Sequence, residues 1–131
     1  MLKIKRETDY AIRCLIYLAE QTDKVLSIEE ISKASRVNAT FVAKILQSLA
    51  KSNLIRSFRG VNGGFCLARN AAEINLLDII VAIEGRVALN ECVVNPQGFE
   101  CLKSCTVHPV WVKVKNSLEE QLRNYSLAEL I

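Results

Sequence analysis

At 131 residues, the chain has room for one compact domain, or for a small domain with a dimerisation arm. Half of the residues are apolar and 24% are charged, a composition typical of soluble globular proteins. Apolar runs stay well short of the roughly 18 residues that span a bilayer. The basic residues 1–6 lead into charged residues rather than into the apolar region of a signal peptide. We therefore expect a cytoplasmic protein that does not engage a membrane.

The net charge of +3 is unevenly distributed along the chain. Residues 1–70 hold 12 Lys and Arg against 6 Asp and Glu, whereas residues 71–131 hold 5 against 8. A basic half joined to a mildly acidic half predicts that the basic half binds a polyanion. Chance scatter of charges is the alternative explanation of the same balance.

The first two predicted elements are helices. Residues 8–21 place apolar side chains at helical spacing. Ser27 then precedes Glu30 by three residues, which is the capping-box pattern, and predicts a short second helix over 28–35. In this box the Ser27 hydroxyl and the Glu30 carboxylate each accept a backbone hydrogen bond in the first turn.

A third helix and a hairpin follow. Asn38 can cap a helix over 39–51, and two helices of this size joined by about three residues form a helix-turn-helix. Residues 54–58 and 65–68 are predicted strands, and the Asn62-Gly63 step between them favours a tight hairpin turn. A hairpin directly after a helix-turn-helix is a wing.

The second half of the chain is predicted to be helical at both ends. Asn75 can cap a helix that ends at Gly85. Residues 86–105 are rich in Asn, Pro and Gly and are expected to be irregular, and 107–124 is the longest predicted helix. The run from Ser126 to Glu129 repeats the capping-box pattern and predicts a short terminal helix.

The predicted fold class is mainly α with a small β part: a winged helix-turn-helix with a long C-terminal dimerisation helix. We expect a DNA-binding domain in residues 1–72, and a cysteine-containing loop (86–108) with the dimerisation helix in residues 73–131. The long helix has an apolar face wider than a domain of this size needs for its own core, so it is expected to pair with a second copy. An internal core helix is the alternative. The face consists of Val107, Val110, Trp111, Val114, Leu118, Leu122 and Tyr125.

The second helix of a helix-turn-helix fits the major groove of DNA and presents its first turn to base edges. The wing adds basic side chains and glycines that can approach the DNA backbone or enter the minor groove. The residues predicted to contact DNA are Ser27, Thr40, Phe41, Lys44, Gln47, Arg56, Arg59, Gly60 and Gly63. The alternative is that these are ordinary solvated residues and that Phe41 belongs to the core. One such module contacts few base pairs, which favours a homodimer on paired half-sites.

Five cysteines in a chain without a secretion signal argue against a disulfide framework. Cys14 and Cys66 fall on predicted apolar positions and are interpreted as packing residues. The other three form the pattern Cys92-x8-Cys101-x3-Cys105-x2-His108, which includes the only histidine of the chain. Thiolates are soft ligands that bind iron–sulfur clusters or zinc, so this pattern predicts a metal site. A closed Cys3His zinc site, a metal-free thiol switch and free structural cysteines are the alternatives.

The order of these features resembles the IscR/NsrR/RirA group of bacterial winged-helix regulators, the Rrf2 family, over essentially the whole chain. The resemblance rests on the wing Ser57-Phe58-Arg59-Gly60-Val61-Asn62-Gly63-Gly64-Phe65-Cys66-Leu67, the three-cysteine loop, the His108-Pro109-Val110-Trp111 entry to the long helix and the terminal Tyr125-Ser126-Leu127-Ala128-Glu129-Leu130. It implies homodimers that bind palindromic operators in double-stranded DNA. It also implies a 2Fe–2S or 4Fe–4S cluster whose state, set by iron supply, nitric oxide or oxidants, controls DNA affinity.

The resemblance further implies that Cys92, Cys101 and Cys105 are the cluster ligands. For the fourth ligand it leaves two candidates: His108 matches the histidine of IscR-like members, and Asp9 matches the carboxylate that NsrR-like members contribute from the partner subunit. The spacing is longer between the first two cysteines, and shorter between the last two, than in IscR-like members. The implied function is that of a cluster-dependent transcription regulator, most simply a repressor.

An enzyme is the competing class of function. The sequence has no glycine-rich nucleotide-binding fingerprint, no Cys-x-x-Cys pair and no second histidine for acid–base work. We therefore expect neither catalytic residues nor a small-molecule substrate.

Overall fold

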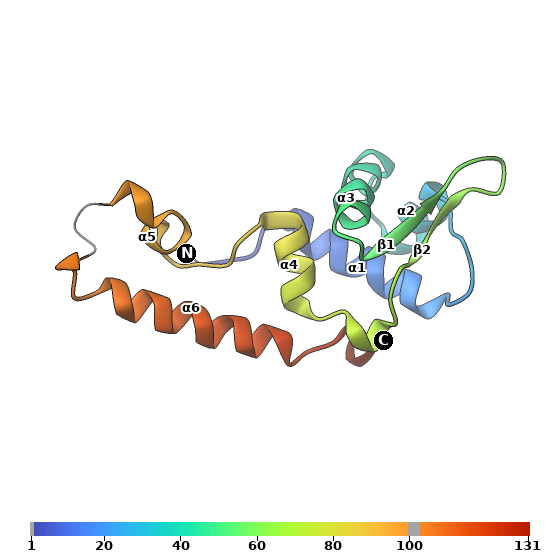
Figure 1. The fold of residues 1–131 in the computed structure, drawn as a ribbon. Coiled ribbons are helices and arrows are strands. Elements are labelled where there is room, and N and C mark those ends of the chain that lie inside the picture. Colours follow the sequence, from blue (N-terminus) through green and yellow to red (C-terminus); the bar gives the residue numbers. More distant parts are fainter. Residues whose placement is uncertain (1, 100–102) are drawn as a thin grey trace.

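The elements of the chain are seen in a computed structural model that describes residues 2–99 and 103–131. Figure 1 shows a group of helices with a two-stranded hairpin at one side, and one long helix that extends away from this group on the other side. The predicted fold class, a mainly helical winged helix-turn-helix, is confirmed. In chain order the elements are α1 (Arg6–Glu20), α2 (Ile28–Ser35), α3 (Ala39–Lys51), β1 (Ile55–Phe58), β2 (Gly64–Leu67), η1 (Ala71–Glu73), α4 (Leu76–Glu84), α5 (Glu91–Val94), η2 (Pro96–Gly98), α6 (His108–Arg123) and η4 (Leu127–Leu130).

Helix α1 lies at the centre of the core because its apolar side chains recur at helical spacing. Ala11, Leu15 and Leu18 are buried, and α1 packs against α2, α3, α4, β2 and η4. Side chains from these and neighbouring segments complete the core, among them Ile31, Val42, Ile45, Leu46, Leu49, Leu54, Ile55, Ile74, Ile79 and Leu127. The helix begins at Arg6, two residues before its predicted start.

The hairpin is held in place by an additional backbone pairing. Strands β1 and β2 are antiparallel, with Phe58 opposite Gly64 at the end nearest the turn. Leu26, just before α2, exchanges two backbone hydrogen bonds with Phe65, at 2.9 and 2.8 Å. This pairing attaches the wing to the segment that begins the helix-turn-helix, so the two parts keep a fixed relation.

The predicted helix caps form, with one difference. The Ser27 hydroxyl oxygen accepts the Glu30 N–H at 3.2 Å, which is one half of the predicted capping box. A complete capping box forms at Asn75. Its side chain accepts the backbone N–H of Asp78, the third residue of α4, and the Asp78 carboxylate accepts the backbone N–H of Asn75. Before η4, the capping box predicted for Ser126 and Glu129 is present, and the Ser126 N–H donates to the Glu129 carboxylate at 2.8 Å.

The sequence predicts residues 86–105 to be irregular, but the described stretch 86–99 contains two short helical turns. Helix α5 follows Asn90, whose carbonyl oxygen accepts the Val93 N–H at 3.1 Å, and η2 begins with Pro96. Proline is favourable at the first position of a helix because its missing N–H has no partner there. The prediction failed here because an element of three or four residues is too short to show an apolar repeat.

Helix α6 forms an arm that is anchored at its C-terminal end (Figure 1). It packs against α4 and α5, and none of its side chains is buried. Beyond the helix, the Leu127 N–H donates to the Ile74 carbonyl oxygen at 2.7 Å, and the Leu127 side chain is fully buried in the core. In the two described ranges, no helix is long and apolar enough to cross a membrane.

Replacing Gly64 with alanine is expected to displace the wing. A Cβ at this position would lie 2.3 Å from the Leu26 carbonyl oxygen, so the backbone must shift, at a cost of about 1–3 kcal/mol. Thermal unfolding of Gly64→Ala should show a loss of this size in the free energy of unfolding. Gly98→Ala is the control because its Cβ meets nothing within 4 Å. Equal stability of the two variants would contradict the close approach described here.

Candidate nucleic-acid interface and cysteine site

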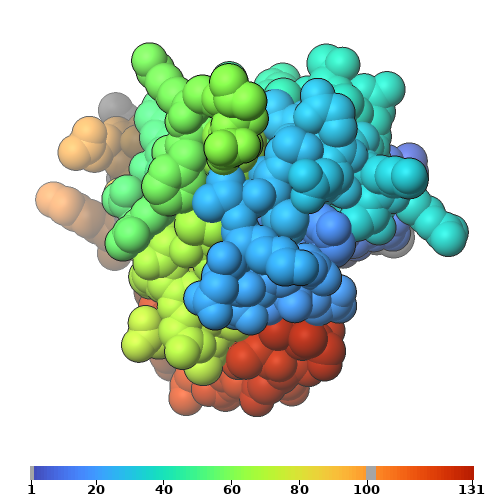
Figure 2. Space-filling view, turned by 90° about the vertical axis from the view of Figure 1, so that its right-hand side faces the viewer, coloured from blue at the N-terminus to red at the C-terminus, as the bar shows by residue number. Residues whose placement is uncertain are grey.

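The exposed face of α3 carries the helix residues predicted to contact DNA. Thr40, Phe41, Lys44 and Gln47 are exposed, while the opposite face of the helix is buried. The Asn38 side-chain oxygen accepts the Thr40 N–H at 2.8 Å and so begins the helix, as predicted. Figure 2 shows the hairpin (green) and the α2–α3 segment (blue to cyan) toward one side of the molecule, with the C-terminal residues (red) toward the other. The first turn of α3 is thus accessible to a major groove.

Phe41 is a surface residue with a partner on α1. Its side chain is 50% exposed, so the alternative that it belongs to the core is wrong. The Phe41 ring meets the Tyr10 ring edge to face, with centroids 6.2 Å apart and an interplanar angle of 66°. The Arg13 guanidinium lies over the Tyr10 ring, 6.0 Å from its centroid. One side of Phe41 therefore rests on α1, and its exposed part can reach a base.

The wing presents cations and, in addition, two apolar side chains. The residues predicted in it, which lie on the strands or in the turn, are Arg56, Arg59, Gly60 and Gly63. Ser27 is half-buried beside the base of the wing. Phe58 and Val61, which were not predicted, are 47% and 103% exposed. Strand alternation would have found Phe58, because it shares a face with Arg56; nothing in the sequence marks Val61.

The cysteine segment, residues 92–108, brings two of the predicted metal ligands into contact. Cys92 lies on α5 and is 7% exposed, and its Sγ is 3.1 Å from Nδ1 of His108, the first residue of α6. Cys105 is half-buried just before α6, and Cys101 lies outside the described residues. Across residues 2–99 and 103–131, no three His, Cys, Asp or Glu side chains gather closely enough to hold a metal ion.

Asp9 lies on the first turns of α1 and has a partner within its own helix. Its carboxylate forms an ion pair with Arg13, four residues later, with an N–O distance of 3.1 Å. Both side chains are about half exposed, at 48% and 53%, so the pair is open to solvent and contributes little to stability. Asp9 is thus held on the surface, where a second molecule can reach it.

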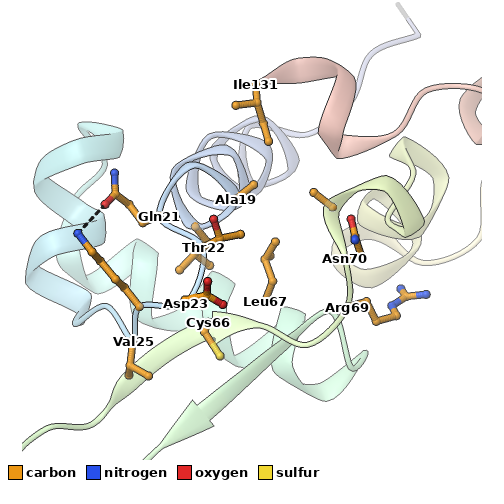
Figure 3. Close-up of a pocket in the computed structure, with 13 residues that line it drawn as sticks. Ala19, Gln21, Thr22, Asp23, Val25, Cys66, Leu67, Arg69, Asn70 and Ile131 are labelled. Carbon is orange, nitrogen blue, oxygen red and sulfur yellow. Dashed lines mark hydrogen bonds between the residues drawn. The ribbon is translucent and has the colours of Figure 1, made fainter.

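The two isolated cysteines have different surroundings. Cys14 is fully buried, as predicted for a packing residue; burial raises the pKa of its thiol, and a hydrogen bond with Ser35 acts in the opposite direction. Cys66 is half-buried and lines a cavity of about 450 Å³ between the end of α1 and β2 (Figure 3). The lining contains apolar side chains and three charged ones, Asp23, Lys24 and Arg69. Cys66 is therefore less tightly packed than predicted.

A carboxylate that the sequence analysis overlooked caps α1. Oε2 of Glu84, the last residue of α4, accepts the backbone N–H of Lys5 at 3.0 Å and the hydroxyl of Thr8 at 2.5 Å. Thr8 is fully buried, and Lys5 is the N-cap position of α1 but makes no side-chain cap of its own. No local signal identifies Glu84, because it lies 79 residues from Lys5.

Comparisons with known proteins agree with this arrangement. The profile of the family Rrf2, described as an iron-dependent transcriptional regulator, matches residues 4–131. Protein aau3 of Rhizobium meliloti is 34% identical over 132 residues, which cover 99% of this chain and 85% of that protein. The HTH-type transcriptional regulator NsrR of Oceanobacillus iheyensis is 32% identical over 139 residues, which cover 99% of this chain and 90% of that protein.

A solved structure shows the same fold. T. potens IscR has a TM-score of 0.71 and 29% sequence identity, over 98% of this chain and 85% of that chain. The family consists of transcriptional regulators rather than enzymes, as the absence of catalytic motifs predicted. The exposed α3, the wing and the match over nearly the whole chain together identify this protein as a DNA-binding transcriptional regulator that belongs to the Rrf2 family.

Proposed function

We propose that this regulator binds operator DNA as a homodimer and that an iron–sulfur cluster in the cysteine segment controls its affinity for DNA. The contact of 3.1 Å between Cys92 Sγ and His108 Nδ1 carries the proposal. A thiol and an imidazole at this distance are two metal ligands of suitable chemistry, held where the α6 arm begins. The family description, iron-dependent transcriptional regulator, supports the same function.

The donor set of the cysteine segment fits such a cluster. Cys92, Cys101 and Cys105 would supply thiolates, and His108 or Asp9 of the partner subunit would complete the set. When bound, the cluster supplies a labile, redox-active group that responds to iron supply, nitric oxide or oxidants. The chain itself keeps Cys92 away from solvent and positions His108 on the first turn of α6.

The first turn of α3 and the wing would form the DNA interface. Thr40 and Phe41 would meet bases in the major groove, and Lys44 and Gln47 would reach bases or phosphates. The wing would follow the backbone with Arg56 and Arg59, and its turn glycines Gly60 and Gly63 would allow a close approach. The Ser27 oxygen already accepts the Glu30 N–H, and its own hydrogen remains suited to a phosphate.

A second copy of the chain is the expected partner of α6. Five apolar residues on the helix or at its ends are exposed by 37% to 51%: Val107, Val110, Val114, Leu118 and Tyr125. Val110, Val114 and Leu118 follow each other at intervals of four residues and so share one face. Trp111 and Leu122 of the predicted apolar face are half-buried in this chain. Pairing two such faces around a twofold axis would remove both from water.

Replacing Cys92 with serine is expected to abolish cluster binding. Anaerobically reconstituted wild-type protein should absorb visible light and contain iron and sulfide, whereas Cys92→Ser and Cys101→Ala should lose both the colour and the change in operator affinity. Cys66→Ser, which alters a cysteine outside the cysteine segment, is the control and should behave as the wild type. A colourless wild-type protein that contains zinc would indicate a structural zinc site, and one without any metal would indicate a thiol switch. Either result would contradict the proposed cluster.

Replacing Arg59 with alanine is expected to weaken operator binding and to reduce its dependence on salt. Each lost phosphate contact lowers the slope of log affinity against log salt concentration by about 1. The measurement is a titration of operator DNA at several salt concentrations. Arg123→Ala removes the same charge from α6 and is the control. Equal slopes for the two variants would show that the wing does not contact phosphates.

Placing a carboxylate on the apolar face of α6 is expected to separate the dimer. Val114→Glu would bury an unpaired charge, which costs several kcal/mol, so the Kd of the dimer should rise by more than about a hundredfold. Sedimentation at several protein concentrations measures this change. Asn116→Glu adds the same charge at an exposed position on the same helix and should leave the dimer intact. A dimer that survives Val114→Glu would place the interface elsewhere.

A further inference from the structure

Glu84 lies at the end of α4, where the connection to the cysteine segment begins. It is the last residue of α4, and the following residue, Gly85, has a φ of +87° and ends the helix by donating its N–H to the Val81 carbonyl oxygen at 3.0 Å. Six residues, 86–91, then separate Gly85 from Cys92. The Arg86 side chain donates to the Val94 carbonyl oxygen of α5 at 3.4 Å, whereas the Glu84 carboxylate is bonded to an element of the core.

That element is the first turn of α1. The bonds to Lys5 N–H and to the Thr8 hydroxyl place a carboxylate at the N-terminus of α1, where the helix dipole favours a negative charge. Thr8 is fully buried, so its hydroxyl would lose its partner without gaining water if Glu84 moved away. Asp9, the candidate ligand for the partner subunit, directly follows Thr8 in the chain.

The same turn of α1 touches the recognition helix. Tyr10 contacts Phe41 at a centroid distance of 6.2 Å, and Phe41 lies in the first turn of α3. Ile83, the neighbour of Glu84, lines a hollow of about 220 Å³ together with Lys5, Phe41 and Lys44. The end of α4, the start of α1 and the DNA-facing side of α3 thus meet in one place.

We infer that Glu84 is a positioning residue that transmits the state of the cysteine segment to the recognition helix through the first turn of α1. This inference rests on the proposed function, because it assumes that the cysteine segment has two states. A helix cap that served only stability would affect DNA binding equally in both states. A positioning residue instead changes the ratio of the two operator affinities.

The test compares this ratio in four proteins. Operator affinity is measured with cluster-loaded and metal-free samples of the wild type, Glu84→Ala, Glu84→Gln and Thr8→Val. Cluster content is followed by absorbance, and amide hydrogen exchange of residues 5–9 is measured in the metal-free proteins. Allosteric couplings typically change affinity about 5- to 150-fold. We expect the ratio to fall close to one in Glu84→Ala with its cluster intact, together with faster exchange in residues 5–9.

The other two variants keep the test decisive. Glutamine retains an oxygen that accepts both hydrogen bonds, so Glu84→Gln should keep a ratio within a few-fold of the wild type. Thr8→Val removes one bond without opening a cavity and should give an intermediate ratio, which also serves if Glu84→Ala fails to fold. A wild-type ratio in Glu84→Ala, or in Thr8→Val where Glu84→Ala is unfolded, would overturn the inference and leave the proposed function standing. A ratio of one in the wild type itself would overturn the proposed function, and the inference with it.

Discussion

Burial of one face of α1 is the interaction on which the remainder of the structure depends. Ala11, Cys14 and Leu15 are completely excluded from solvent, and the recognition helix, the wing, α4 and the C-terminal η4 all pack near this face. A fully buried leucine such as Leu15 contributes about 1.5–3 kcal/mol, so α1 cannot leave these neighbours without unfolding the core. Small shifts of α1 are therefore shared by every element that contacts it. The central helix thus links the DNA-binding elements to α4 and η4, which lie next to the α6 arm.

The DNA-binding elements and the cysteine segment are separated along the molecule, and α4 lies between them. The hairpin and the cysteine segment lie toward opposite ends in Figure 1, and α4 contacts α1 and α3 on one side and α6 on the other. Ile79 of α4 belongs to the same core cluster as Leu46 of the recognition helix. The cysteine segment thus has a short physical connection to the DNA-binding elements, through packed side chains of α4 and α6.

Local patterns in the sequence predicted most of the elements, because their causes are local. Asn38 and Asn75 cap helices through residues two or three positions away. The tight turn predicted at Asn62-Gly63 was wrong: the loop spans residues 59–63, and its positive φ falls on Gly60. Contacts between distant segments were not predictable, among them Glu84 with Lys5, since no spacing rule connects residues that meet only after folding. Of the three cysteines and one histidine predicted to form a metal site, Cys92 and His108 are in contact. The exposure of Phe41 was left open because the sequence does not show that Tyr10 shields only one side of its ring.

The two ends of the segment between Asn75 and Ser126 are paired with each other. These two residues form a β-bridge, and the Leu76 N–H donates to the Tyr125 carbonyl oxygen at 3.0 Å. In topological terms α4, the cysteine segment and α6 form one loop that is closed at its base. The entropic cost of closing such a loop rises by only about 0.6 kcal/mol for each doubling of its length. Insertions and deletions around the cysteines therefore cost the core little stability, so the cysteine spacing can change without displacing α3 or the wing.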